Sequence, residues 1–123
     1  NVADPSRYGV ANLDKNKNIK SIVEKPKEFV SNWAVTGLYC YDQDAPLYAK
    51  ELKPSDRGEL EITDLNNFYI SEKKITTEFL GQGYTWLDMG THEALLETAN
   101  FVKIIESRQG IKIADLDNIY VKK

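Results

Sequence analysis

The sequence predicts an α/β domain, because strand-like segments alternate with segments whose apolar residues recur every three or four positions. The strand-like segments cover residues 8–13, 19–23, 33–41, 75–80 and 84–87, and the helical ones cover residues 45–52, 59–70 and 91–109. Charged residues follow several of the strands, among them Glu24, Lys25 and Asp88. Open α/β sheets bind ligands beyond their strand ends, so we expect the functional site there.

Residues 8–13 and 19–23 are joined by a polar loop, Asp14 to Asn18, whose length is typical of a β-hairpin. The second strand ends at Glu24-Lys25-Pro26, and the proline should hold Lys25 in an extended conformation and end the strand. Neighbouring side chains of a regular strand point to opposite faces, so Glu24 and Lys25 would contact one ligand only if the chain bends between them. A solvated charge pair is the alternative interpretation.

Residues 33–41 are almost continuously apolar, which predicts a central strand buried on both faces. Gly37 in this strand indicates a bulge, a close approach of a ligand to the backbone, or space for a neighbouring aromatic ring. Cys40 is the single cysteine, so it forms no internal disulfide, and its apolar neighbours predict a small buried side chain.

Three helices are predicted after this strand. Asp44-Ala45-Pro46 begins a short helix that runs through Leu52, with the proline in its first turn. Residues 59–70 should form a helix with one buried stripe, made of Leu60, Ile62, Leu65, Phe68 and Tyr69. Arg57, just ahead of this helix, is either a surface charge or an anion contact. Residues 91–109 form the third helix, with Gly110 as its C-terminal stop, and His92 in its first turn has no second His or Cys near it to form a transition-metal site.

Asp88 stands at the centre of residues 81–96, which read in order as strand, acid, glycine turn and helix start. A carboxylate at a strand end can hold Mg²⁺ through oxygen. An aspartate beside Gly90 can equally stabilise the turn, so both interpretations stay open.

The composition is that of an ordinary soluble domain, since 41% of the 123 residues are hydrophobic and 28% are charged. One domain is expected, and a formal net charge of -3 argues against a nucleic-acid surface. No apolar run predicts a membrane span or a signal peptide, and a reducing cytoplasm fits the single cysteine. The start at Asn1, without an initiator methionine, suggests a piece of a longer protein.

Seven motifs in a fixed order carry a family resemblance. They are Arg7-Tyr8-Gly9-Val10, Glu24-Lys25-Pro26, Ala34-Val35-Thr36-Gly37-Leu38-Tyr39, Arg57-Gly58-Glu59-Leu60-Glu61-Ile62-Thr63-Asp64, Gly83-Tyr84-Thr85-Trp86-Leu87-Asp88, Gly90-Thr91-His92 and Arg108-Gln109-Gly110. This ordered set closely resembles the C-terminal half of bacterial glucose-1-phosphate thymidylyltransferases. The resemblance covers nearly the whole chain, from Asp4 to about residue 113.

The resemblance implies the C-terminal, sugar-binding part of a nucleotide-diphospho-sugar transferase fold with a Rossmann-like mixed sheet. It implies transfer of a deoxythymidylyl group from dTTP to glucose 1-phosphate, giving dTDP-glucose and pyrophosphate, with Mg²⁺ as cofactor and a homotetramer as the full-length assembly. The family's nucleotide-binding half, with its glycine-rich loop and first metal-binding Asp, is not in this sequence. The chain by itself is therefore expected to be inactive.

The resemblance also implies roles for single residues. Glu24 resembles the carboxylate that accepts hydrogen bonds from the glucose hydroxyls, and Lys25 and Arg57 resemble the cations on the sugar phosphate. Asp88 resembles a Mg²⁺ ligand, with Trp86 packed beneath it.

Four further residues resemble parts of the sugar pocket. Gly9 resembles the residue whose backbone approaches the sugar, with Tyr8 beside it, and Val35 and Tyr39 resemble side walls. The resemblance also implies that the substrate's own phosphate is the nucleophile, so no catalytic Ser, Cys or His is expected.

Gln82 stands where relatives commonly carry an Arg that resembles part of a regulatory nucleotide site, so feedback control is in question. Met89 replaces a usual Thr. Two alternatives stay open: an enzyme that uses UTP or CTP with another sugar 1-phosphate, and a non-catalytic sugar-phosphate-binding module.

Overall fold

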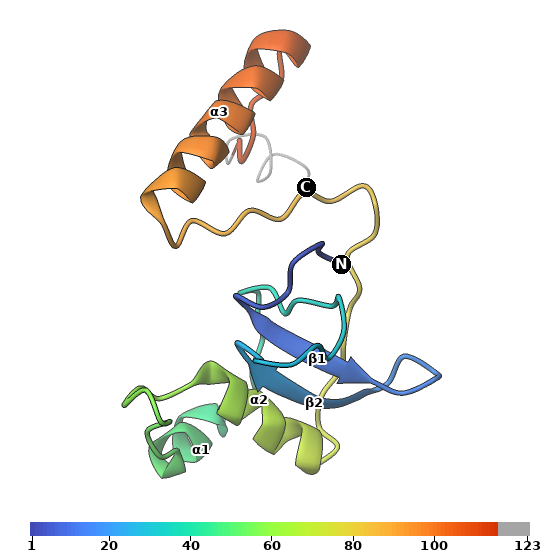
Figure 1. The fold of residues 1–123 in the computed structure, drawn as a ribbon, viewed down its shortest axis with the longest axis vertical. Coiled ribbons are helices and arrows are strands. Elements are labelled where there is room, and N and C mark those ends of the chain that lie inside the picture. The colour runs from blue at the N-terminus through green and yellow to red at the C-terminus, as the bar shows by residue number, and fades with distance from the viewer. Residues whose placement is uncertain (116–123) are drawn as a thin grey trace. The chain divides into compact units, whose positions relative to one another are not determined.

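The hairpin predicted near the start of the chain is present in the computed structural model, which describes residues 1–115 (Figure 1). Strands β1 (Gly9–Leu13) and β2 (Ile19–Glu24) pair antiparallel, with Gly9 opposite Glu24. Asp14 fixes the connecting loop, because its Oδ1 accepts hydrogen bonds from the backbone N–H groups of Asn16 and Asn18, both at 2.8 Å. The predicted polar loop is confirmed.

Helix α2 (Ile62–Ser71) packs against β2, and α1 (Ala45–Glu51) packs against α2 (Figure 1). One side chain joins α2 to the strand. The backbone N–H of Ile22 donates to Asn67 Oδ1 at 2.7 Å, and Asn67 Nδ2 donates back to the carbonyl of Ile22 at 2.8 Å. Ile22 is buried, so the Asn67 amide satisfies two backbone groups that water does not reach.

Asn67→Ala is expected to lower the free energy of unfolding by about 2 to 4 kcal/mol, because it leaves both buried groups of Ile22 without a partner. Urea unfolding followed by circular dichroism measures the change. Asn12→Ala, an exposed position on β1, is the matched control and should change the free energy of unfolding by less than about 0.5 kcal/mol. Equal effects of the two substitutions would show that Asn67 does not anchor α2.

A small aromatic core lies between α1 and α2. Ala45, Leu65 and Tyr69 are buried, and Tyr48, Leu52, Phe68 and Ile75 pack around them. The Tyr69 hydroxyl donates to Asp42 Oδ1 at 2.6 Å, which gives the buried phenol a partner. The predicted helix at residues 45–52 is thus confirmed, and its buried contacts explain why it forms.

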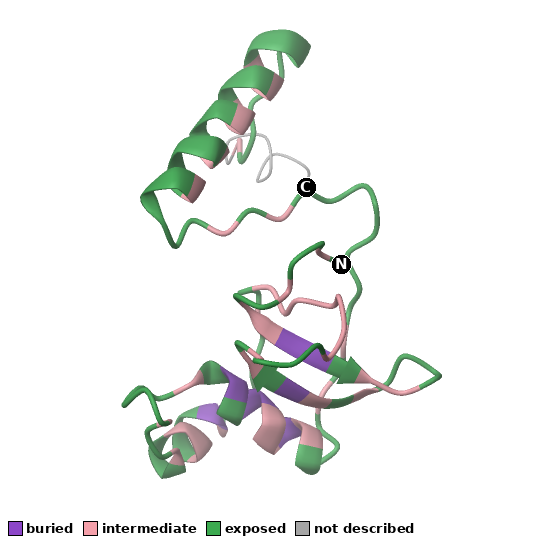
Figure 2. Ribbon diagram, in the orientation of Figure 1, coloured by how far each residue is buried: buried purple, intermediate pink, exposed green. Residues whose placement is uncertain are grey.

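The predicted start and stripe of the second helix are partly wrong. The helix begins at Ile62 instead of Glu59, and Leu60 and Ile62 are exposed. The buried face carries Thr63, Leu65, Asn66 and Tyr69, as the purple segments of α2 in Figure 2 show. Glu59 instead belongs to the preceding loop, which is closed by a hydrogen bond from the Ser55 N–H to the Glu59 carbonyl at 2.8 Å.

The predicted central strand at residues 33–41 is also wrong. Only Ala34 bridges to β1, opposite Val10, and the neighbouring hydrogen bonds are those of Trp33 O and Val35 N. Leu38 is 82% exposed and Cys40 is exposed, so the predicted buried cysteine is wrong as well. A strand needs a partner along its length, and β1 pairs with this run only near Ala34.

Two shorter strand predictions fail for the same reason. Within the described part of the chain, residues 75–80 and 84–87 do not form strands. Their alternating pattern favours an extended backbone but cannot supply a pairing partner. Phe79 still finds an aromatic neighbour, because its ring packs edge-on against Trp33 with centroids 4.8 Å apart.

The chain divides into two units, Asn1–Gly83 and Tyr84–Lys123. The second unit is built on α3 (His92–Gln109), which confirms the third predicted helix. Thr91 caps its start by accepting a hydrogen bond from the Ala94 N–H at 3.1 Å, and Gly110 ends it with a φ of 66°. No residue of α3 is buried, and His92 is exposed (Figure 2).

The polar and apolar residues of 111–121 predict a short strand or an edge segment. Residues 111–115 form neither helix nor strand, and residues 116–121 lie outside the described residues. Of residues 1–115, none belongs to a helix that is long and apolar enough to cross a membrane.

Candidate functional site

The chain bends at Lys25, directly after β2. Lys25 has a φ of 42°, in the left-handed region that costs a non-glycine residue on the order of 1 to 3 kcal/mol. Its N–H still donates to the Tyr8 carbonyl at 3.0 Å, whereas Pro26 has no N–H, so the chain leaves the hairpin within one residue. The extended conformation predicted for Lys25 is therefore wrong, and the bend that a joint contact of Glu24 and Lys25 requires is present.

Glu24 meets α2 and β1 at one point. Thr63 Oγ1 donates to Glu24 Oε2 at 2.6 Å, which uses one of the two carboxylate oxygens. A Cβ atom on Gly9 would lie 3.2 Å from the same Oε2 and 3.3 Å from Thr63 Oγ1. Gly9 thus leaves room for the carboxylate and its partner, which any larger residue would disturb.

Of the two predicted pocket residues, Val35 pairs with β1, and Tyr39 lies close enough to Glu24 for its phenol to be affected by the carboxylate charge. The Val35 N–H donates to the Gly9 carbonyl at 2.8 Å. Burial raises the pKa of the Tyr39 phenol, the charge of Glu24 raises it further, and a hydrogen bond with Asn66 lowers it. Asn66 is itself buried and accepts a hydrogen bond from the Tyr41 hydroxyl at 2.7 Å. Asn66 therefore links Tyr41 to Tyr39, the tyrosine that interacts with Glu24.

Of the two predicted phosphate-binding cations, Arg57 binds Glu61 directly, and the charge of Lys25 also acts on this carboxylate. Arg57 Nε donates to Glu61 Oε1 at 3.1 Å, and Arg57 Nη2 donates to Glu61 Oε2 at 3.2 Å. The hydrogen bond from Ser55 lowers the pKa of Glu61 most, and Arg57 and Lys25 lower it further. Lys25 and Arg57 thus act on the same carboxylate, two residues before Thr63.

The lowered pKa of Glu61 predicts a loss of stability in acid. Ionised Glu61 stabilises the folded state above its unfolded pKa of about 4.3, and this stabilisation disappears as the pH falls through the lower pKa of the folded state. Between about pH 7 and about pH 3, the free energy of unfolding of the wild type should therefore fall more than that of Glu61→Gln. Urea unfolding at both pH values tests this, and Glu72→Gln should keep the wild-type dependence.

Asp88 and Trp86 belong to the second unit, whereas Glu24 belongs to the first. A Cβ atom on Gly90 would lie 3.2 Å from Asp88 Oδ2, so the glycine leaves room for this carboxylate. Among residues 1–115, no three His, Cys, Asp or Glu side chains form a group that could hold a metal ion. Mg²⁺ often binds proteins through one or two carboxylates, with waters and substrate phosphates as its other ligands, so Asp88 alone fits that donor chemistry.

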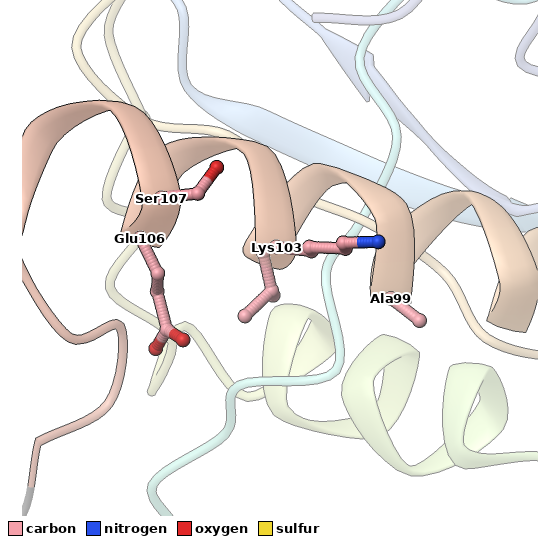
Figure 3. A pocket seen from close by; sticks show the side chains of 5 residues that line it. Ala99, Lys103, Glu106 and Ser107 are labelled. Atoms are coloured by element: carbon pink, nitrogen blue, oxygen red, sulfur yellow. The ribbon is translucent and has the colours of Figure 1, made fainter.

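An open hollow of about 650 Å³ runs along α3, lined by Ala99, Val102, Lys103, Glu106 and Ser107 (Figure 3). None of the predicted site residues lines it. A single helix face without a buried residue offers no enclosed site. The better candidate is the group around Glu24, here called the Glu24 cluster, which contains Tyr8, Gly9, Glu24, Lys25, Tyr39, Arg57, Glu61, Thr63 and Asn66.

Three residues of the cluster were not predicted from the sequence: Glu61, Thr63 and Asn66. The available signal was the polar pair Thr63 and Asn66, three positions apart on an apolar helix. Polar side chains at that spacing share the buried face and need partners there.

Comparison with known proteins gives a consistent result. The model of the nucleotidyl transferase family matches residues 1–104. A glucose-1-phosphate thymidylyltransferase of Xanthomonas campestris pv. campestris (strain B100) is 54% identical over 112 residues, which are 91% of this chain and 38% of that protein. The enzyme of the same name from Neisseria gonorrhoeae is 50% identical over 118 residues, which are 96% of this chain and 41% of that protein.

A solved structure shares the fold. The crystal structure of a Bacillus anthracis protein assigned as a glucose-1-phosphate thymidylyltransferase, in complex with sucrose, superposes with a TM-score of 0.68 at 50% identity. The match covers 81% of this chain and 39% of the other. These comparisons confirm the resemblance and the α/β fold class, and the chain spans about two fifths of the length of the relatives it matches.

Proposed function

The chain belongs to the nucleotidyl transferase family, and on that premise we propose that it is the sugar-phosphate-binding part of a glucose-1-phosphate thymidylyltransferase. The complete enzyme would join dTTP and glucose 1-phosphate into dTDP-glucose and release pyrophosphate. Its assembly as a homotetramer and its location in the cytoplasm are part of the same proposal.

The observation that carries the proposal is the contact between Glu24 and Thr63 beside Gly9, together with Arg57, which binds Glu61 two residues before Thr63. A carboxylate accepts hydrogen bonds from adjacent sugar hydroxyls, and Gly9 leaves the room that the Glu24 carboxylate and Thr63 occupy. Lys25 and Arg57 supply the positive charge that a phosphate monoester needs. The cluster therefore contains groups for binding both the sugar and the phosphate of a sugar phosphate.

In the proposed reaction, an oxygen of the sugar phosphate attacks the α-phosphorus of dTTP, the new P–O bond forms, and the bond to the pyrophosphate leaving group breaks. Glu24 orients the sugar, while Lys25 and Arg57 hold the attacking phosphate and reduce its repulsion from the triphosphate. Asp88 would be a ligand of Mg²⁺. When bound, this ion would neutralise charge on the reacting phosphates.

A graft tests the proposal directly. The matching segment of the Xanthomonas campestris relative is replaced by this chain, and pyrophosphate release is measured with dTTP, glucose 1-phosphate and Mg²⁺. The graft should turn over, because the relative supplies the part that the chain does not match. The relative without its segment and the 123-residue chain alone should both stay at background.

Two results would contradict the proposal. A graft that folds but releases no pyrophosphate would favour a non-catalytic binding module. Turnover by the chain alone would show that it needs no second part. The same assay with galactose and mannose 1-phosphates tests which sugar the cluster selects.

A further inference from the structure

Arg57 lies between two glutamates whose surroundings differ. Its Nη2 donates to Glu59 Oε2 at 2.7 Å and lies 2.9 Å from Glu61 Oε1. The Glu61 side chain is only 12% exposed, whereas that of Glu59 is 66% exposed. The same guanidinium therefore has one sheltered partner and one solvated partner.

Glu61 is held in place by a contact other than those with Arg57. Ser55 Oγ donates to Glu61 Oε1 at 2.8 Å. Ser55 is itself held by the loop, since its N–H donates to Glu59 O and its carbonyl accepts from the Gly58 N–H, both at 2.8 Å. Gly58 has a φ of 77°, which a residue with a side chain rarely adopts. This loop presents Glu61 in one place, and the Nε and Nη2 bonds then orient the guanidinium plane.

Glu59 lacks such support. Its side chain is solvated, and an exposed ion pair contributes only about 0.2 to 1 kcal/mol. Nη2 carries two hydrogens, so a new acceptor can replace Glu59 without displacing Glu61. A phosphate, with more negative charge than a carboxylate, would compete well for that hydrogen.

We propose that Glu61, held by Ser55, is a positioning residue that aims Arg57 at the sugar phosphate, and that Glu59 is an exchangeable counter-ion which this phosphate displaces. The inference rests on the proposed function, in which Arg57 contacts the phosphate. The two acids then have opposite effects on affinity, although each carries one negative charge near the same cation. A purely electrostatic role would give them the same sign.

The test measures binding of glucose 1-phosphate to the 123-residue chain by NMR titration, with the Arg57 Nε–Hε resonance as a local probe. Glu59→Gln should lower the Kd about two- to fivefold, because the competing carboxylate is gone. Glu61→Gln should raise the Kd at least about threefold and shift the Nε–Hε resonance before any ligand is added. Glu72→Gln, at the other end of α2, is the matched control and should leave the Kd within about twofold of the wild type.

Ser55→Ala is a milder version of Glu61→Gln and should raise the Kd in the same direction, which keeps the test valid if Glu61→Gln does not fold. The inference is overturned if Glu59→Gln and Glu61→Gln shift the Kd in the same direction, or if Ser55→Ala leaves it unchanged. A wild-type chain that does not respond to glucose 1-phosphate at Arg57 overturns the proposed function itself. Failure of the proposed function is distinguishable from failure of the inference, because the first is measured on the wild type and the second on the variants.

Discussion

Asp88→Asn is expected to lower the kcat of the grafted enzyme by about a hundredfold or more at limiting Mg²⁺, while the fold is retained. The substitution keeps the size and shape of the side chain but removes one of the charges that would hold the ion. The half-buried Asp88 already has room beside Gly90, so an amide of the same size should fit. Pyrophosphate release measured across a range of Mg²⁺ concentrations gives the size of the loss.

Glu97→Gln, an exposed position on α3 in the same unit, is the matched control for the removed charge. It should leave kcat and its Mg²⁺ dependence unchanged. Near wild-type turnover of Asp88→Asn at limiting Mg²⁺ would mean that Asp88 only stabilises the turn beside Gly90. Higher Mg²⁺ restoring the variant would instead support the role of a ligand.

The elements that could be predicted are those whose signals are local. Asp14 closes the hairpin loop by its own hydrogen bonds, and Thr91 and Gly110 mark the two ends of α3. Residues 33–41 could not be predicted in the same way, because an apolar run carries no information about which segment pairs with it or how far that pairing extends. The exposure of Cys40 follows from that same error.

The site shows a similar division. Family motifs indicate Tyr8, Gly9, Glu24 and Lys25, and the hairpin register brings all four together at one end. The contact of Thr63 with Glu24 joins residues 39 positions apart, and it depends on how α2 packs on β2. No local sequence pattern predicts how α2 packs on β2. The catalytic and binding roles of the gathered residues stay predictions.

Glu24→Gln and Lys25→Met are expected to impair the grafted enzyme in different ways, although the two residues are adjacent. Gln keeps one acceptor oxygen, so discrimination among sugars should weaken by about 1 to 3 kcal/mol. Lys25→Met keeps the aliphatic stem and removes the cation, so it should raise the KM for glucose 1-phosphate and lower kcat. Steady-state kinetics with glucose, galactose and mannose 1-phosphates measure both effects.

Salt separates the two roles further. Added salt weakens the attraction between Lys25 and the phosphate in the wild type only, so the gap between wild type and Lys25→Met should narrow as salt rises. Glu24→Gln should show little narrowing, because a hydrogen bond to a neutral hydroxyl responds weakly to screening. Lys27→Met, an exposed lysine two residues further on, is the control and should retain wild-type kinetics at both salt levels. Matching kinetic profiles for Glu24→Gln and Lys25→Met would contradict the separate assignments, because a general distortion of the bend at Lys25 would then explain both defects.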